Sequence, residues 1–316
     1  MSNEEKIIKY FTKNYNKIGD DCAYLSQTKQ LISSDTLVEN IHFDLKYFTP
    51  KNIAHRLFTA NYSDIQSSGG KPKYVLLNLS FPNKNFRFVN KIIKNFHRYC
   101  LKYGIEIIGG DTTASDKIFL SLTIISDAIN KNKIIKRSQA KINDKIYTFS
   151  GIGYSKLGFM NIYKNLKLPK DISALSKKQF LSPKIYTYYD LFKKIKLNSC
   201  MDVSDSLLST LRSISSQSNK KIVLTDLSNI NKKLNVFFKN EQLYNSLILS
   251  SGEEFVPVFT SPLNLLKLNN KKSFKTRGIK LTCIGRIEKG KGVHLKNTNL
   301  NKIKIFDHFK NNYSVL

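Results

Sequence analysis

The spacing of apolar residues along the chain predicts helices and strands in alternation. The clearest helix covers residues 89–103, whose apolar positions recur three and four residues apart. These positions are Val89, Ile92, Ile93, Phe96, Cys100 and Tyr103. Gly104 follows them directly, as is common at the C-terminus of a helix. A second helix is predicted to begin at Thr49 and Pro50, because a capping hydroxyl precedes proline at the first helical position.

Shorter segments complete this pattern. Residues 3–12 have a helical pattern. Apolar, β-rich segments predict strands at 18–25, 30–34, 74–81, 105–108, 118–125 and 146–149. Strands that alternate with helices predict an α/β (α+β) fold. Residues 130–143 are basic and polar, so we place a boundary there between two domains, residues 1–136 and 137–316.

The strong positive charge of the chain could indicate an anionic partner. The chain has 316 residues and carries 52 Lys and Arg against 23 Asp and Glu, a formal net charge of +29. A nucleic acid or an anionic membrane would match this charge. However, the lysines are scattered, and the sequence has no ribonucleoprotein aromatic motif, zinc finger or basic zipper. We therefore interpret the charge as compositional bias that still attracts phosphorylated ligands, and expect no specific nucleic-acid partner.

Other features narrow the class further. No apolar run is as long as a transmembrane helix, and the acidic, amphipathic N-terminus does not resemble a secretory signal. The four cysteines lie far apart, which argues against a zinc site or a disulfide framework. We expect a cytoplasmic protein with no membrane partner.

Two glycine-rich segments resemble phosphate-binding loops. The segment GRIEKGKG from Gly285 to Gly292 nearly matches the Walker A pattern, but glycine stands where that pattern needs a hydroxyl for magnesium. We interpret it as a hairpin turn. Gly151 and Gly153 follow a predicted strand, but the next glycine is too far along for a dinucleotide fingerprint. We interpret this segment as a turn between a strand and a helix.

The aspartates carry the main functional signal. They stand beside small or hydroxyl residues next to apolar segments, in IGDDCA, ISSDTLV, NYSDI, IIGGDTT and CMDVSDSLL. A single aspartate in such a place is usually a helix cap or a turn residue. Caps rarely need paired acids, however, and several carboxylates in one cleft repel one another unless cations neutralise them. Magnesium prefers such oxygen ligands and bridges carboxylates to nucleotide phosphates. The pattern therefore predicts a Mg²⁺-dependent enzyme that uses ATP.

These segments, in this order, resemble the thiamine-monophosphate kinases, which belong to a superfamily with aminoimidazole ribonucleotide synthetase and selenophosphate synthetase. The resemblance extends nearly from end to end. It is carried by IGDDCAYL, ISSDTLVENIHFDL, NYSDIQSSGGKP, IIGGDTT, KRSQAKIND, MDVSDSLL, LSSGEEF, IGRIEKGKGV and FDHF. The combination of DTLVENIHF with a later GGDTT is specific to this kinase within the superfamily.

The resemblance implies a reaction and a set of site residues. ATP would phosphorylate thiamine monophosphate to thiamine diphosphate by direct, in-line transfer with several Mg²⁺ ions. The matching metal ligands are Asp21, Ser33, Ser34, Asp35, Asp64, Asp111, Asp202 and Asp205, and Asp35, Asp64, Asp111 and Asp205 are the catalytic group among them. The matching ATP positions are Tyr103, Gly110, Asp111, Arg137 and Ser204. The matching positions for the acceptor are His42, Glu253 and Phe306.

Several of these positions have another interpretation from the residues alone. Tyr103 is equally suited to a helix core, and Arg137 lies in a basic stretch typical of a surface. His42 fits a core histidine, Glu253 a capped turn, and Phe306 a buried ring. The family segment GGEDYE is SGEEFV here, so Glu254 stands in place of an aspartate.

The resemblance also implies a two-domain fold and a homodimer. An N-terminal α/β domain would pair with a second subunit and bind ATP near that interface, and a C-terminal α/β domain would follow. One alternative is another ATP-using enzyme of the superfamily, although the reactive N-terminal Cys of a selenophosphate synthetase is absent. The other alternative is a basic nucleic-acid-binding protein on the same scaffold.

Overall fold

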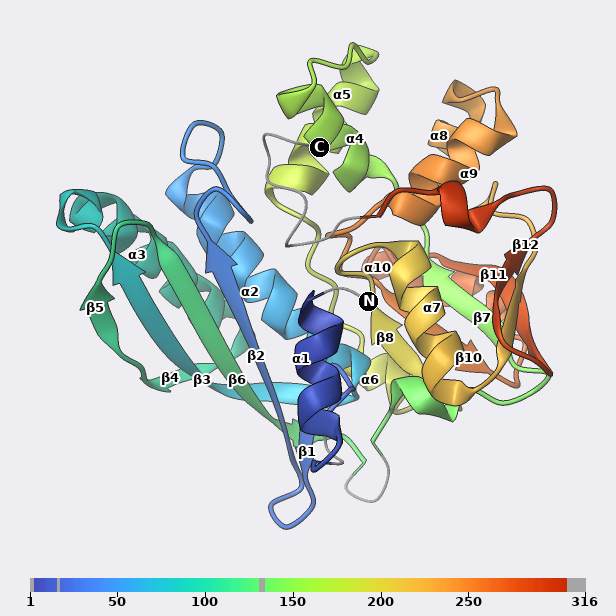
Figure 1. Cartoon of the computed structure of the whole chain (residues 1–316), viewed down its shortest axis with the longest axis horizontal. Coiled ribbons are helices and arrows are strands. Elements are labelled where there is room, and N and C mark those ends of the chain that lie inside the picture. Colours follow the sequence, from blue (N-terminus) through green and yellow to red (C-terminus); the bar gives the residue numbers. More distant parts are fainter. Residues whose placement is uncertain (1–2, 16–17, 131–133, 306–316) are drawn as a thin grey trace.

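The computed structural model describes residues 3–15, 18–130 and 134–305, which form two lobes, each built on its own β-sheet (Figure 1). The first sheet has the order β1-β2-β6-β3-β4, and β5 also pairs with β3. Its strands are β1 (Ala23–Leu25), β2 (Gln30–Val38), β3 (Gly70–Phe81), β4 (Glu106–Gly109), β5 (Thr112–Ala114) and β6 (Phe119–Ala128). The second sheet has the order β12-β9-β11-β7-β10-β8. Its strands are β7 (Lys145–Phe149), β8 (Cys200–Asp202), β9 (Lys221–Leu224), β10 (Pro257–Ser261), β11 (Leu281–Glu288) and β12 (Gly292–Leu295).

The helices follow the same division into lobes. The N-terminal lobe contains α1 (Asn3–Thr12), α2 (Pro50–Ser67) and α3 (Phe86–Tyr103). The C-terminal part contains α4 (Tyr154–Tyr163), α5 (Lys170–Leu181), α6 (Tyr189–Phe192), α7 (Leu207–Ser218), α8 (Lys232–Phe237), α9 (Glu241–Ser250) and α10 (Lys272–Thr276). The α/β fold expected from the sequence is therefore confirmed.

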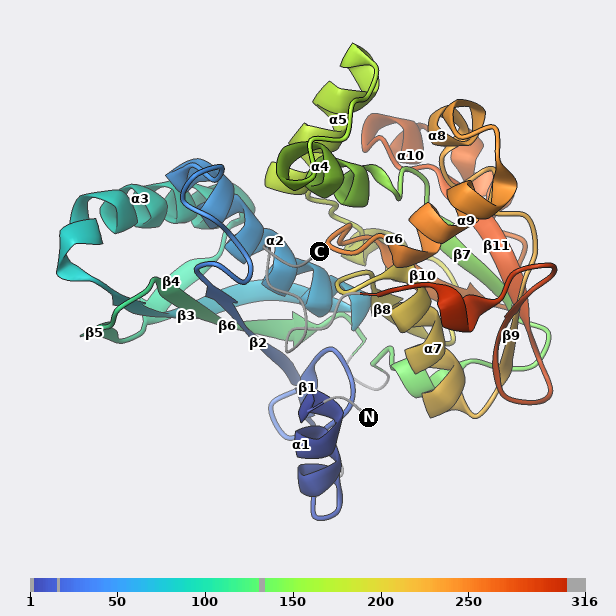
Figure 2. The ribbon, with the colours of Figure 1, turned by 45° about the horizontal axis from the view of Figure 1, so that its top comes forward.

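The two long N-terminal helices form where their local signals predict. The Thr49 hydroxyl accepts a hydrogen bond from the Asn52 N–H (3.3 Å), and the Asn52 side chain accepts one from the Thr49 N–H (3.0 Å). This reciprocal cap fixes the start of α2. Gly104 ends α3 in the left-handed conformation (φ 65°). Figure 2 shows α2 and α3 on one face of the N-terminal sheet, where Leu120 and Leu122 of β6 are fully buried.

The strand predictions are correct in place but not in length. β1 begins only at Ala23, not at residue 18, and β2 continues to Val38 because it pairs with β6 along its whole length. Similarly, β3 begins at Gly70, four residues before the predicted strand.

The two glycine-rich segments have different outcomes. Gly151 and Gly153 connect β7 to α4, as predicted for a turn between a strand and a helix. The prediction of a hairpin between β11 and β12 is wrong. β9 lies between these strands and pairs antiparallel with β11 and parallel with β12. The chain therefore reverses direction after β11, but β12 does not pair with β11. β9, which comes from an earlier part of the sequence, lies between them.

Helices α4 and α5 connect the lobes. They stand above and between the two sheets in Figures 1 and 2. Phe159 of α4 and Phe180 of α5 lie in the apolar core of the N-terminal lobe, whereas Leu157 of α4 lies in the core of the C-terminal lobe. The lobes are thus joined by shared packing. No helix of the described residues is long and apolar enough to span a membrane.

Candidate active site

A cavity of about 750 Å³ opens between the two lobes, and its lining collects most of the residues selected from the sequence. The segment before β1, strand β2 and helix α2 contribute from the N-terminal lobe. Loops that follow β8 and α9 contribute from the C-terminal lobe. The selected residues in the lining are Asp21, Ser33, Ser34, Asp35, His42, Asp64, Arg137, Asp202, Ser204, Asp205 and Glu253.

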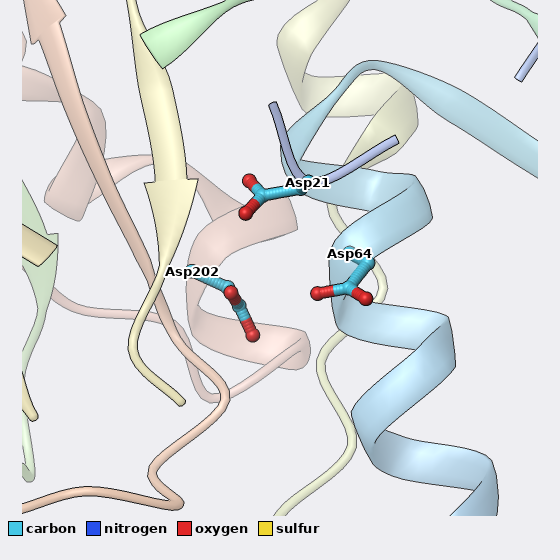
Figure 3. Close-up of side chains that lie close together, drawn as sticks. All are labelled: Asp21, Asp64 and Asp202. Carbon is cyan, nitrogen blue, oxygen red and sulfur yellow. The ribbon is translucent and has the colours of Figure 1, made fainter. Parts of the chain in front are cut away.

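Three of the aspartates converge at one end of this cavity. Asp21, Asp64 and Asp202 come from the segment before β1, from α2 and from the end of β8, and their side chains point toward one another (Figure 3). One carboxylate oxygen of each lies within 4.8 Å of the others. Three segments that are distant from one another in the sequence thus supply one cluster of hard oxygen ligands.

Without a bound cation, burial and mutual repulsion disfavour the ionised form of these carboxylates. Burial raises the pKa of Asp64 well above its usual value, and the charges of Asp35, Asp202 and Asp21 raise it further. Burial also raises the pKa of Asp202, with Asp21 as the next cause. A divalent cation would remove the repulsion and replace the lost hydration, so the oxygen-only donor set fits Mg²⁺.

Serine hydroxyls orient the three carboxylates. The Ser33 hydroxyl donates to Asp64 (2.7 Å), the Ser63 hydroxyl to Asp202 (2.6 Å) and the Ser67 hydroxyl to Asp21 (2.7 Å). Ser63 and Ser67 were not selected from the sequence. Their spacing of four residues on α2, on either side of Asp64, is the signal that would have found them.

Ser33 and Ser34 do not point the same way. Successive side chains of a strand face opposite sides, so Ser33 faces Asp64 while the Ser34 hydroxyl is within 3.0 Å of the Thr123 hydroxyl on the other face of the sheet. Asp35 lies on the same side of β2 as Ser33, and its N–H donates to the Asn61 side chain (3.2 Å). Only one of the two serine hydroxyls is therefore directed at the acidic cluster.

Arg137 belongs to the cavity rather than to the open surface. Its guanidinium forms an ion pair with Asp21, and its backbone N–H donates to Asp20 (2.9 Å). Ser204 lies in the loop after β8, where its carbonyl accepts the N–H of Glu253. Arg137 thus contacts the acidic cluster, and Ser204 contacts the loop that carries Glu253.

Three of the residues proposed for ATP lie outside the residues that line the cavity. Asp111 is exposed, and its carboxylate accepts the Thr112 N–H (2.8 Å). Gly110 packs so closely on β3 that a Cβ would lie 1.9 Å from the Leu77 carbonyl oxygen, so only glycine fits there. The Tyr103 ring packs against Phe58 at 4.9 Å between centroids. Within one chain the structure does not bring these residues to Asp64, and their nucleotide roles stay predictions.

A buried arginine is the main site residue that sequence reasoning missed. The side chain of Arg56 on α2 is 1% exposed, yet it lines the cavity. Its guanidinium lies over the rings of Phe48 (4.8 Å) and Phe180 (5.0 Å), forms an ion pair with Glu253 and donates to the His42 carbonyl (3.0 Å). Arg56 precedes Asp64 by eight residues, two helical turns, so both side chains lie on one face of α2. That spacing was the available signal.

Two of the residues proposed for the acceptor, His42 and Glu253, contact this arginine. The Val38 N–H donates to Nδ1 of His42 (3.0 Å), so a neutral imidazole there carries its proton on Nε2. Glu253 and Phe255 adopt left-handed backbone conformations (φ 53° and 50°), which is costly for residues with a side chain and frequent at ligand sites. Phe306 lies outside the described residues.

Glu254, which stands in place of the family's aspartate, holds the loop after α9 against α4. Its carboxylate accepts the N–H groups of Gly153 (2.7 Å) and Ser155 (3.2 Å) and the Ser251 hydroxyl (2.6 Å). Burial raises the pKa of Glu254 to about 7, although these hydrogen bonds oppose the shift. The substitution therefore keeps an acid that anchors the loop next to Glu253.

The likeness to known proteins agrees with this geometry. Residues 19–127 match the family model for the AIR synthase related protein, N-terminal domain. The thiamine-monophosphate kinase of Buchnera aphidicola subsp. Schizaphis graminum is 35% identical over 310 residues, which covers 93% of this chain and 94% of the relative. That of Haemophilus influenzae is 31% identical over 322 residues, covering 93% and 91%. The solved structure described as AaThiL complexed with AMPPCP and TMP superimposes with a TM-score of 0.78 at 26% identity, covering 94% of each chain. The full-length similarity, together with the acidic cluster between the lobes, shows that the chain belongs to the thiamine-monophosphate kinase family.

Proposed function

We propose that the protein phosphorylates thiamine monophosphate to thiamine diphosphate with ATP, by direct transfer and with several Mg²⁺ ions. The observation that carries the proposal is the convergence of Asp21, Asp64 and Asp202 at one end of a cavity of about 750 Å³ between the lobes. Both reacting groups are anionic phosphates, and catalysis of such a transfer consists mainly of alignment and charge neutralisation. Bound magnesium would supply that neutralisation.

The chain's own residues would hold the metals and the two ligands. We propose Asp21, Asp35, Asp64, Asp202 and Asp205 as metal ligands, with Asp111 and oxygens of Ser33 and Ser34. Arg137, Ser204, Tyr103 and Gly110 would contact ATP, and His42, Glu253 and Phe306 the acceptor. The hydroxyls of Ser63 and Ser67 keep two of the carboxylates oriented before any ligand binds. We propose that residues 1–136 form the domain for ATP and Mg²⁺ binding and for dimerisation, that residues 137–316 form the C-terminal α/β domain, and that the protein acts in the cytoplasm.

We also propose that the protein works as a homodimer. Asp111 and Gly110 lie outside the cavity lining of their own chain, and the neighbouring strand β4 exposes Ile107 (38%) and Ile108 (48%). A second copy over this strand would bury both side chains and enclose Asp111. Sedimentation velocity should therefore give a mass near twice 36.3 kDa, and Ile108→Asp should shift it to a monomer. A wild-type monomer with full activity would contradict this proposal.

A single assay tests the function. Purified protein with ATP, Mg²⁺ and thiamine monophosphate should yield ADP and thiamine diphosphate in equal amounts. Release of free phosphate alone, or strong preference for another acceptor, would favour another ATP-using enzyme of the superfamily. Oligonucleotide binding that survives physiological salt without kinase activity would favour the nucleic-acid alternative.

A further inference from the structure

The cavity is lined by many carboxylates and few cations. The lining carboxylates are Asp20, Asp21, Asp35, Asp64, Asp202, Asp205 and Glu253, and the lining arginine and lysine side chains are Arg56, Arg137 and Lys156. Arg56 is paired with Glu253, and Arg137 with Asp21. Within the part of the chain that the structure describes, Lys156 is the one of these three cations that forms no ion pair.

Lys156 stands in the first turn of α4, where the backbone donors are already used. The N–H groups of Gly153 and Ser155 donate to Glu254, and that of Lys156 donates to the Ser251 hydroxyl (3.2 Å). The positive end of α4 is thus neutralised by a buried carboxylate. The group of α4 that can bind a ligand is therefore the half-buried side chain of Lys156. Its Nζ lies 5.7 Å from the centre of the Phe159 ring.

A chain of contacts places Lys156 at the acceptor end of the cavity. Phe159 packs against Phe180 (5.9 Å between centroids), and the Phe180 ring lies 5.0 Å from the Arg56 guanidinium. Arg56 in turn binds Glu253 and the His42 carbonyl. Lys156 therefore belongs with the proposed acceptor residues, and not with Arg137 beside Asp21.

The electrostatic situation of Lys156 favours an incoming anion. Burial lowers the pKa of its ammonium group, and the nearby Lys164 ammonium lowers it further. A partly desolvated cation of this kind gains more from an anion than a solvated one does. Thiamine monophosphate carries its negative charge on the phosphate, which matches a lysine as a point-charge donor.

We propose that Lys156 binds the phosphate of the acceptor and so selects a phosphorylated over an unphosphorylated acceptor. This assignment rests on the proposed function, because it takes the acceptor to be thiamine monophosphate. Lys156 supplies the positive charge that the paired arginines do not offer at that end of the cavity.

The test compares Lys156→Met with Lys156→Arg and with Lys164→Met. Lys164 is exposed and lies outside the cavity lining. Lys164→Met removes the same charge as Lys156→Met, so it is the matched control. Lys156→Met should weaken binding of thiamine monophosphate about 10-fold or more, as expected for the loss of a charge-assisted hydrogen bond. Calorimetry should show unchanged binding of thiamine, which lacks the phosphate, and kinetics should show an unchanged KM for ATP. Lys156→Arg should keep most of the affinity, and Lys164→Met should match wild type.

Other results would overturn the assignment. An equal loss for thiamine and thiamine monophosphate would mean that Lys156 only supports the shape of the cavity. A raised KM for ATP alone would assign the lysine to the nucleotide. If wild type neither binds nor phosphorylates thiamine monophosphate, the proposed function fails separately. In that case the affinities of wild type and Lys156→Met for inorganic pyrophosphate test whether Lys156 binds phosphate. Equal affinities would overturn a phosphate-binding role.

Discussion

Asp64→Asn should remove phosphoryl transfer almost completely and yet make the metal-free protein more stable. Asp64 is one of the three carboxylates of the acidic cluster, so its loss removes charge needed to hold the cations that neutralise the reacting phosphates. Loss of one such electrostatic contact typically lowers kcat by about 10²–10³-fold. Asparagine keeps the size of the side chain and an oxygen that can accept from Ser33, so the fold should be preserved.

The expected gain in stability follows from the raised pKa of Asp64. A buried carboxyl whose pKa is raised by folding contributes most stability at acid pH and loses it as pH rises through the raised pKa. In Asp64→Asn this loss cannot occur. The variant should therefore melt above wild type at pH 7.5 in EDTA, and the difference should shrink toward pH 5. Magnesium should raise the melting temperature of wild type more than that of the variant.

A matched variant separates the cluster from a general effect of charge. Asp127→Asn removes the same charge from an exposed carboxylate 3.7 Å from Lys73, outside the cavity lining, and should resemble wild type in activity and melting. Near-normal turnover of Asp64→Asn would show that the metal site is wrongly assigned. A lower melting temperature in EDTA would show that its carboxylate is stabilising without a metal.

Local sequence signals predicted the start of α2 and the end of α3 because a helix cap depends on neighbouring residues, whereas the acidic cluster joins residues that are distant in the sequence. The cap at Thr49 and the glycine at Gly104 act within one turn, and α2 and α3 begin or end there. Asp21, Asp64 and Asp202 each stand at the edge of an apolar segment, and such edges meet where two lobes face each other. The family resemblance supplied the grouping that spacing alone could not.

The wrong hairpin prediction and the missed site residue Arg56 have a common cause, because both features depend on contacts between residues distant in the sequence. The place of β9 between β11 and β12 depends on pairing between strands distant in sequence, so the local turn looked like a hairpin. Arg56 was missed because a charged residue inside an apolar stripe is ordinarily taken as a surface residue. Its burial depends on two rings and a glutamate from distant segments, Phe48, Phe180 and Glu253.

Arg56→Met should be among the most destabilising single changes in the N-terminal lobe. Methionine fills part of the volume but removes the hydrogen bond to the His42 carbonyl and the ion pair with the Glu253 carboxylate. Breaking a buried ion pair from one side typically costs about 3–5 kcal/mol, and we expect the lower part of that range because Glu253 is 31% exposed. Urea unfolding should show this as a lower midpoint with an unchanged slope.

A second variant and a control keep this prediction testable even if Arg56→Met folds poorly. Adding Glu253→Gln removes the carboxylate charge that Arg56 faces in wild type, so the double variant should recover about 1–2 kcal/mol relative to Arg56→Met. Arg277→Met removes an exposed guanidinium 3.9 Å from Asp190 and should cost less than about 1 kcal/mol. Where the variants remain folded, the KM for the acceptor should rise while that for ATP stays near wild type, because Arg56 orients Glu253 and His42 and not Arg137. An Arg56→Met protein with the midpoint of wild type would mean that the rings and backbone hold this end of the cavity without the guanidinium.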